Sequence, residues 1–182
     1  MYAIVKDGAI TATGTMKQLF PNTSFPNGVA DTDWKNAEGV KDVVEGERKD
    51  PVYYYVTPGD IALVDDVPTQ QYTNTAKLLD DRDATDNDGN KVKDKDGNQI
   101  IQHGLKTGMT RQVKENANSL LSQTDWMVIR KAERDVDIPS ATATYRAAIV
   151  TECARLETAI GNASDVDALA TVMAGQNWPT EG

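Results

Sequence analysis

The spacing of apolar and polar positions divides the chain into two halves that favour different kinds of structure. Up to about Leu79, short runs of Val, Ile, Tyr and Thr alternate with Gly, Pro and Asn, which is typical of strands joined by turns. From Leu105 onward, Ala, Leu, Glu, Arg and Gln dominate and apolar residues recur every three or four positions, as in amphipathic helices. The pattern predicts an α+β protein whose β-rich and helical parts follow each other along the chain.

The first half is expected to form a small, mostly antiparallel sheet with short helices. The expected strands span residues 2–5, 9–13, 40–45, 52–56, 61–64 and 69–73. Asp7-Gly8 supplies the positive-φ pair that a tight turn between the first two strands needs. Thr15 and Thr32 are the expected N-caps of two short helices, at 16–20 and 32–38.

A polar segment separates the two halves. Residues 80–98 carry two Asp-Gly pairs around Lys91-Val92-Lys93, which predicts an exposed β-hairpin or an extended linker. The expected organisation is a β-rich domain at 1–79, a polar hairpin or linker at 80–104 and a helical bundle at 105–182. No internal repeat is apparent.

The helical half is expected to form a bundle of three or four helices with short loops. The expected helices span about 110–122, 126–135, 139–160 and 166–174. The third has the clearest stripe of apolar residues, and Cys153 lies on it, where a cysteine acts as a small apolar side chain. Pro139 is expected at or near its first turn and Gly161 at its end.

Composition removes several classes of function. The 182 residues include 19 Lys and Arg against 28 Asp and Glu, so the net charge is −9 and a nucleic-acid partner is not expected. No apolar run approaches the roughly 20 residues that span a bilayer, so no membrane partner is expected. Cys153 and His103 are the only cysteine and histidine, which removes a disulfide framework, most zinc sites and most histidine-based catalysis. No cofactor, metal site or catalytic residue is predicted.

The acidic polar segment invites a calcium interpretation. Asp86, Asp88 and Gly89 match the third, fifth and sixth positions of an EF-hand loop, but Ala84 and Lys95 would then stand first and last, where oxygen ligands are needed. A solvated hairpin with Asp-Gly turns is the favoured interpretation, and weak cation binding is the alternative.

Four aromatic residues are candidates for contacts with other proteins: Tyr53, Tyr55, Trp126 and Trp178. In a strand, Tyr53 and Tyr55 would share one face, which either packs in the core or meets a partner. Trp126 is also expected to anchor a junction between two helices. Trp178, near the C-terminus, either folds back onto the bundle or docks on another chain.

One stretch resembles a known group of proteins. Residues 117–134 (ANSLLSQTDWMVIRKAER), with Tyr145-Arg146 and the terminal Asn177-Trp178-Pro179 further on, resemble the C-terminal helical module of small tail proteins of tailed bacteriophages. The opening MYAIVKDGAI and the LFPNTSF segment are similar to the start of related virion proteins. The resemblance implies contacts with tail, baseplate or fibre proteins in a symmetric assembly, and it brings no catalytic residues.

Three hypotheses follow from the sequence. The first is a structural component of a phage tail, at the baseplate or fibre-attachment region, made in the host cytoplasm and located in the virion. The second is a tail or fibre assembly chaperone that is absent from the particle. The third is a small hydrolase that uses carboxylates near residues 80–96, which would require a concave site with an acid of raised pKa.

Overall fold

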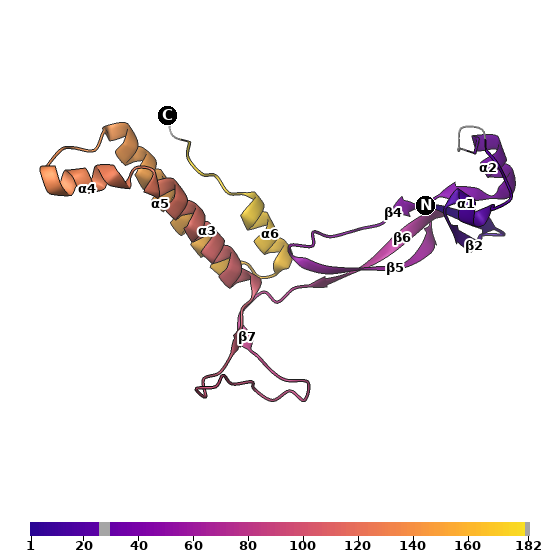
Figure 1. The fold of residues 1–182 in the computed structure, drawn as a ribbon, viewed down its shortest axis with the longest axis horizontal. Coiled ribbons are helices and arrows are strands. Elements are labelled where there is room, and N and C mark those ends of the chain that lie inside the picture. Colours follow the sequence, from indigo (N-terminus) through magenta and orange to yellow (C-terminus); the bar gives the residue numbers. More distant parts are fainter. Residues whose placement is uncertain (26–29, 181–182) are drawn as a thin grey trace. The chain divides into compact units, whose positions relative to one another are not determined.

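The structure is a computed structural model that describes residues 1–25 and 30–180 (Figure 1). It divides into two compact units, Met1–Thr75 and Ala76–Gly182, and each is described by itself. Small, largely antiparallel sheets occur together with helices, which confirms the α+β class predicted from the sequence.

The N-terminal unit begins with a small sheet covered by two short helices. The elements are β1 (Tyr2–Lys6), β2 (Ala9–Gly14), α1 (Met16–Leu19), α2 (Thr32–Glu38) and β3 (Val40–Asp42). The strands lie in the order β2-β1-β3 and are antiparallel. Asp7 and Gly8 have φ values of 50° and 73°, so the predicted tight turn between β1 and β2 is confirmed.

The N-cap residue predicted from the sequence is correct for α1 and wrong for α2. The Thr15 and Gln18 side chains form a capping box at α1. At α2 the prediction of Thr32 as N-cap is wrong, because Asp31 precedes the helix and its carboxylate accepts the backbone N–H of Trp34 at 2.7 Å. Both residue types cap helices, and the extended backbone of Asp31 aims its carboxylate at that amide.

An aromatic cluster joins the helices to this sheet. The indole of Trp34 packs edge-on against the rings of Phe20 and Phe25, with centroids 4.8 Å and 4.7 Å apart. These rings lie against buried Met16 and Val40. Trp34 is therefore a core residue of the N-terminal unit.

The rest of the N-terminal unit is a long ribbon of β4 (Val44–Glu45), β5 (Tyr54–Val64) and β6 (Val67–Ala76), in the order β4-β6-β5. The strands predicted at 52–56 and 61–64 belong to one strand, which runs without a break through Pro58-Gly59. Asp65 and Asp66, with φ values of 48° and 61°, form the turn into β6. The predicted strand 40–45 is divided between two sheets, and β4 runs parallel to β6.

The three consecutive tyrosines do not alternate as the sequence predicts. Tyr53 lies in a turn before β5 and is half-buried, so it does not share a strand face with Tyr55. Tyr54 is buried and Tyr55 is 62% exposed. A turn at 51–53 delays the start of the strand, and the expectation placed on Tyr53 is therefore wrong.

The C-terminal unit starts with a prong of polar residues, where β7 (Arg82–Asp83) pairs antiparallel with β8 (Ile101–Gln102). Further out, bridges join Thr85 to Lys91 and Lys93 to Gln99. Of the two alternatives left open by the sequence, the polar segment takes the hairpin form.

The prong contains an internal repeat that the sequence analysis missed. Residues 85–92 (TDNDGNKV) and 93–100 (KDKDGNQI) fold into two equivalent loops, visible as the two lobes below β7 in Figure 1. In each loop the first aspartate accepts two backbone N–H groups at 2.8–2.9 Å, from the second aspartate and from the asparagine. Ala84, Val92 and Ile100 close a ring of three backbone hydrogen bonds between the loops. The eight-residue period was hidden because only one position in each repeat is apolar.

The helical part consists of α3 (Leu105–Ser122), α4 (Asp125–Arg134), α5 (Ser140–Asn162) and α6 (Val166–Ala174). α5 packs against both α3 and α6. Pro139 takes the N-cap position of α5, beside the first turn as predicted, whereas the helix continues through Gly161 to Asn162 instead of ending at the glycine.

The predicted apolar stripe of α5 forms the core of this part. Ile149, Leu156 and Ile160 are fully buried and Tyr145 is 9% exposed. Cys153 is only half-buried, and its Sγ donates to Glu157 at 3.4 Å. Burial and that carboxylate raise the pKa of the thiol, so the thiolate form is disfavoured.

The ribbon generates a test of backbone packing. A Cβ on Gly46 would lie 2.4 Å from the carbonyl oxygen of Gln70, to which the Gly46 N–H donates at 3.0 Å. We expect Gly46→Ala to destabilise the N-terminal unit by roughly 1–3 kcal/mol, because strand backbone must move apart. Urea denaturation followed by circular dichroism measures this. The control is Gly59→Ala, whose Cβ would lie 3.6 Å from its nearest atom, and equal midpoints for the two variants would contradict the expectation.

Candidate interaction surface

The junction between α3 and α4 is held by one arginine from α5. Arg146 donates to the carbonyl oxygen of Leu121 at 2.7 Å and to the Thr124 hydroxyl at 2.6 Å, both through Nη1. Its Nη2 donates to the Asp125 carboxylate at 2.9 Å. The guanidinium thus joins the end of one helix, the turn and the start of the next, and we call this group of contacts the Arg146 clamp.

The Arg146 clamp includes a buried polar group. Thr124 is only 2% exposed, and its hydroxyl also donates to Leu121 at 3.2 Å. A buried hydroxyl without partners costs about 1–3 kcal/mol. The fork of N–H donors on arginine suits this site, because a lysine ammonium is a point charge that does not span several acceptors at fixed angles.

α4 has an apolar side that lies in solvent. Trp126 is 53% exposed and Ile129, one turn later, is 54% exposed. None of the residues of this helix is buried. Glu133, a further turn along, lies on the same side of the helix. Trp126, Ile129 and Glu133 form the surface that we call the α4 face.

α4 is held in place by polar contacts and not by burial of its apolar side. Arg130 lies over the Trp126 ring at 4.9 Å. Lys131 of α4 binds two carboxylates that lie beyond the helix end, Asp135 at 2.6 Å and Asp137 at 2.7 Å. These hydrogen bonds raise the pKa of Lys131 and lower that of Asp137. Because the Arg146 clamp fixes the junction, Trp126 does not anchor it, and that expectation from the sequence is wrong.

Trp178 folds back onto its own unit. Its ring packs against Ala117, Tyr145 and Ile149, and its Nε1 donates to Gln176 at 2.9 Å. The buried Glu152 holds the preceding tail, since Oε1 accepts the Asn177 backbone N–H at 2.7 Å.

Arg155 completes the hold on the C-terminal tail. It binds both Glu152 oxygens at 2.7 Å and the Gly175 carbonyl at 3.0 Å. The hydrogen bond from Arg155 is the main reason why the pKa of Glu152 lies below its usual value. The tail is thus held by a buried carboxylate as well as by Trp178.

The tyrosine candidates lie in the other unit. Burial, and then the charge of Asp50, raise the pKa of Tyr53. Tyr55 stands on the exposed side of β5. The four candidates are therefore divided between the two units, with Tyr53 and Tyr55 in one and both tryptophans in the other. Trp126 is the more exposed tryptophan of the helical unit.

His103 has an acidic neighbour that its sequence surroundings did not reveal. The Asp81 carboxylate lies 2.8 Å from His103 Nδ1 and accepts the Gly104 N–H and the Thr107 hydroxyl, each at 2.8 Å. Gly104, at the N-cap position of α3, has no side chain that could cap the helix, and the Asp81 carboxylate caps it instead. These hydrogen bonds lower the pKa of Asp81 to about 2.

Two further acids of the prong, Asp86 and Asp94, are committed to its loops. Loop hydrogen bonds also lower the pKa of Asp86 and of Asp94, which is opposite to the raised pKa that the hydrolase hypothesis requires. Within residues 1–25 and 30–180, no three His, Cys, Asp or Glu side chains gather closely enough to hold a metal ion.

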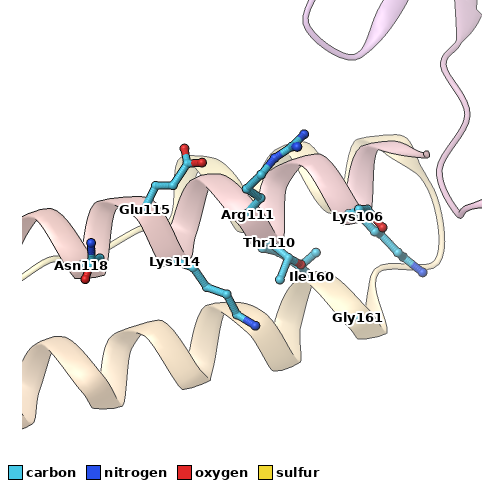
Figure 2. Close-up of a pocket in the computed structure, with 9 residues that line it drawn as sticks. Lys106, Thr110, Arg111, Lys114, Glu115, Asn118, Ile160 and Gly161 are labelled. Atoms are coloured by element: carbon cyan, nitrogen blue, oxygen red, sulfur yellow. The ribbon is translucent and has the colours of Figure 1, made fainter. Parts of the chain in front are cut away.

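A groove runs between α3 and the C-terminal end of α5 (Figure 2). It has a volume of 510 Å³, and the buried Ile160 lines it together with Lys106, Thr110, Arg111, Lys114 and Glu115 among others. Lys114 extends toward α5 and binds Glu157 at 2.9 Å, whereas Arg111 and Glu115 extend from the other side of α3. We call it the α3–α5 groove.

No family model matches the chain, and neither a curated protein nor a solved structure matches it. Among the helices that the structure describes, none has the length and apolar character needed to cross a bilayer.

The Arg146 clamp generates a stability test. We expect Arg146→Leu to lower the free energy of unfolding of the helical unit by roughly 2–3 kcal/mol, because buried Thr124 loses a charged partner. Arg146→Lys should restore only part of this. Chemical denaturation followed by the helical circular dichroism signal measures it, with Arg134→Leu at the exposed end of α4 as the control. Equal midpoints for the Arg146 and Arg134 variants would show that the clamp contributes nothing.

The cap at α3 generates a test of pH dependence. The folded pKa of Asp81, about 2, lies below the unfolded value of about 3.9. Its contribution to stability is therefore present above pH 4 and is lost as the pH falls toward 2. Melting temperatures should differ between wild type and Asp81→Asn at pH 5 and converge near pH 2. Asp88→Asn is the control, and a constant difference across this range would disprove the role of the charge.

Proposed function

We propose that this chain is a structural component of a bacteriophage tail that acts through protein–protein contacts, in the baseplate or fibre-attachment region. The support begins with the resemblance of residues 117–134, Tyr145-Arg146 and the terminal Asn-Trp-Pro to small tail proteins. It continues with what these residues do in the fold.

Most residues of this resemblance have a task inside the helical unit. Leu121, Thr124, Asp125 and Arg146 make the clamp. Tyr145 and Trp178 pack in the core. The contacts of these residues stabilise the fold of the helical unit and do not indicate a reaction.

Trp126 lies outside the core of the helical unit, and its exposure is the observation that carries the proposal. Its indole remains half exposed on a helix whose start is fixed by the Arg146 clamp. A fixed, half-exposed tryptophan beside an exposed isoleucine is typical of a protein contact, since tryptophan dominates binding energy at interfaces. In the parts of the chain that the structure describes, no group of three His, Cys, Asp or Glu side chains could hold a metal ion.

The test is the presence of the protein in particles of the phage that encodes it. Gradient-purified particles are analysed by quantitative mass spectrometry against the major tail tube protein, with infected-cell lysate as the reference. A fixed copy number per tail, in a small multiple of three or six, is the expected result. Absence from particles together with abundance in lysate would overturn it and support the assembly chaperone instead.

A further inference from the structure

We propose that the tip of the β5–β6 ribbon of one copy docks on the α4 face of a second copy, so that chains join head to tail. The ribbon tip consists of Val64, Asp65, Asp66 and Val67. This names the partner of the α4 face and rests on the proposed function. Each surface is formed within a single unit, so the contact between molecules needs no particular arrangement of the two units.

The ribbon tip has an uncommon backbone. Asp65 and Asp66 have φ values of 48° and 61°, and a two-residue turn with positive φ at both positions is of type I′. Aspartate is common at the first of these positions, whereas glycine is preferred at the second, where Asp66 stands. Residues held in such conformations concentrate at functional sites. The turn by itself therefore gives no reason for two carboxylates at the tip.

Exposed valines accompany the two carboxylates. Val64 is 47% exposed and Val67 is 41% exposed. Because they flank a two-residue turn, they pair across the hairpin and lie on one face of the ribbon. Val44, which is 45% exposed, lies on the same face, since it pairs with Thr69, two residues after Val67. The tip thus combines an apolar patch with acidic groups, as a surface for protein contact does.

The α4 face has the matching composition. Trp126 and Ile129 are 53% and 54% exposed on a helix without a buried residue. Arg130 and Arg134 follow Trp126 on successive turns of the same side of the helix, and Arg130 lies over the indole at 4.9 Å. Two apolar side chains are therefore bordered by two guanidinium groups.

Charge favours this pairing of surfaces. Within residues 1–25 and 30–180, Asp65 and Asp66 form no ion pair, and neither do Arg130 and Arg134. A guanidinium group can donate two parallel N–H bonds to one carboxylate. In the docked pair, the two carboxylates of the tip supply the two arginines with the missing opposite charges.

The remaining charges of the two surfaces are also opposite in sign. Lys41 donates from Nζ to the carbonyl oxygen of Asp66 at 2.6 Å, which places a cation beside the ribbon tip. Glu133 lies on the α4 face beside the two arginines. Two acids and a lysine thus meet two arginines and a glutamate, and the arrangement selects this partner over a surface of uniform charge.

The wider distribution of charge agrees with this. Residues 1–75 carry 6 Lys and Arg against 11 Asp and Glu, which gives a net charge of −5. α4 carries 3 Lys and Arg against 2 Asp and Glu. An acidic unit is attracted to a helix of positive net charge, and salt weakens this attraction.

The contact is heterologous, because two different surfaces meet. Such contacts build a closed ring when the rotation between copies closes, and an open filament when it does not. The tip of a hairpin is small compared with the roughly 800 Å² per partner of a stable complex. Association of the isolated chain should therefore be weak and should depend strongly on concentration.

The experiment reverses the charges of each surface in the full chain and measures mass by sedimentation and light scattering. The reversed-tip variant is Asp65→Lys with Asp66→Lys, and the reversed-helix variant is Arg130→Glu with Arg134→Glu. We expect wild type to gain mass with concentration and each variant alone to remain monomeric, because like charges then meet. An equimolar mixture should associate again, since each surface finds the opposite charge on the other variant.

A second variant keeps the turn of the ribbon tip. Asp65→Asn with Asp66→Asn retains side chains that tolerate positive φ and removes only the charges. We expect it to weaken association about 10-fold or more. The matched control is Asp88→Asn with Asp96→Asn, which removes two exposed carboxylates from the prong and should associate like wild type. Circular dichroism verifies that all variants fold.

The apolar part of the contact is tested at Trp126. Trp126→Ala should weaken association about 30-fold or more, because the largest side chain of the α4 face is lost. The control is Val150→Ala, which truncates a residue of α5 that is 56% exposed and should associate like wild type.

Three outcomes would overturn the proposal. They are a wild type that stays monomeric at every concentration, charge-altered variants that associate like wild type, and a mixture of folded reversed variants that does not associate. A ribbon tip that binds α4 of its own molecule would give the first of these. None of them touches the proposed function, because a monomer that is present in purified particles at fixed copy number would still be a tail component with another partner for its α4 face.

Discussion

The helical unit depends on one guanidinium group. Arg146 on α5 binds the Leu121 carbonyl in the last turn of α3, the buried hydroxyl of Thr124 and the carboxylate of Asp125 at the start of α4. Without it, a short helix with no buried residue would have little to fix its direction. The same contacts leave Trp126 and Ile129 in solvent, so the residues that order the junction also present the candidate surface.

The prong is stabilised in a different way, because it has almost no apolar residues to bury. Each of its two loops is closed by one aspartate, Asp86 or Asp94, that accepts neighbouring backbone N–H groups. At its base, Asp81 supplies the cap that Gly104 lacks. A Cβ at Gly104 would lie 2.4 Å from the Leu79 carbonyl, so the joint requires a glycine and takes its capping group from elsewhere.

These arrangements explain why we consider contact rather than catalysis. The prong carboxylates with lowered pKa values, Asp81, Asp86 and Asp94, are already occupied by backbone and side-chain donors. Two features of the helical unit that remain available for contact are the α4 face and the α3–α5 groove, which is lined by residues of α3 from Lys106 to Asn118. Two separate surfaces on one unit are what a repeating or bridging component of an assembly needs.

The sequence by itself determined the features that depend on residues a few positions apart. These include the class, the turn at Asp7-Gly8, the cap at Thr15 and the apolar stripe of α5, because turns, caps and helical faces are set by local geometry. Only the tertiary structure decided that Tyr53 precedes its strand, that β5 is continuous through Pro58, and that Trp126 is displayed. The same holds for the pairing of Asp81 with His103 and of Arg146 with Thr124, which are 22 residues apart in both cases. Contacts at such separations follow from how whole elements pack, and no spacing in the sequence encodes them.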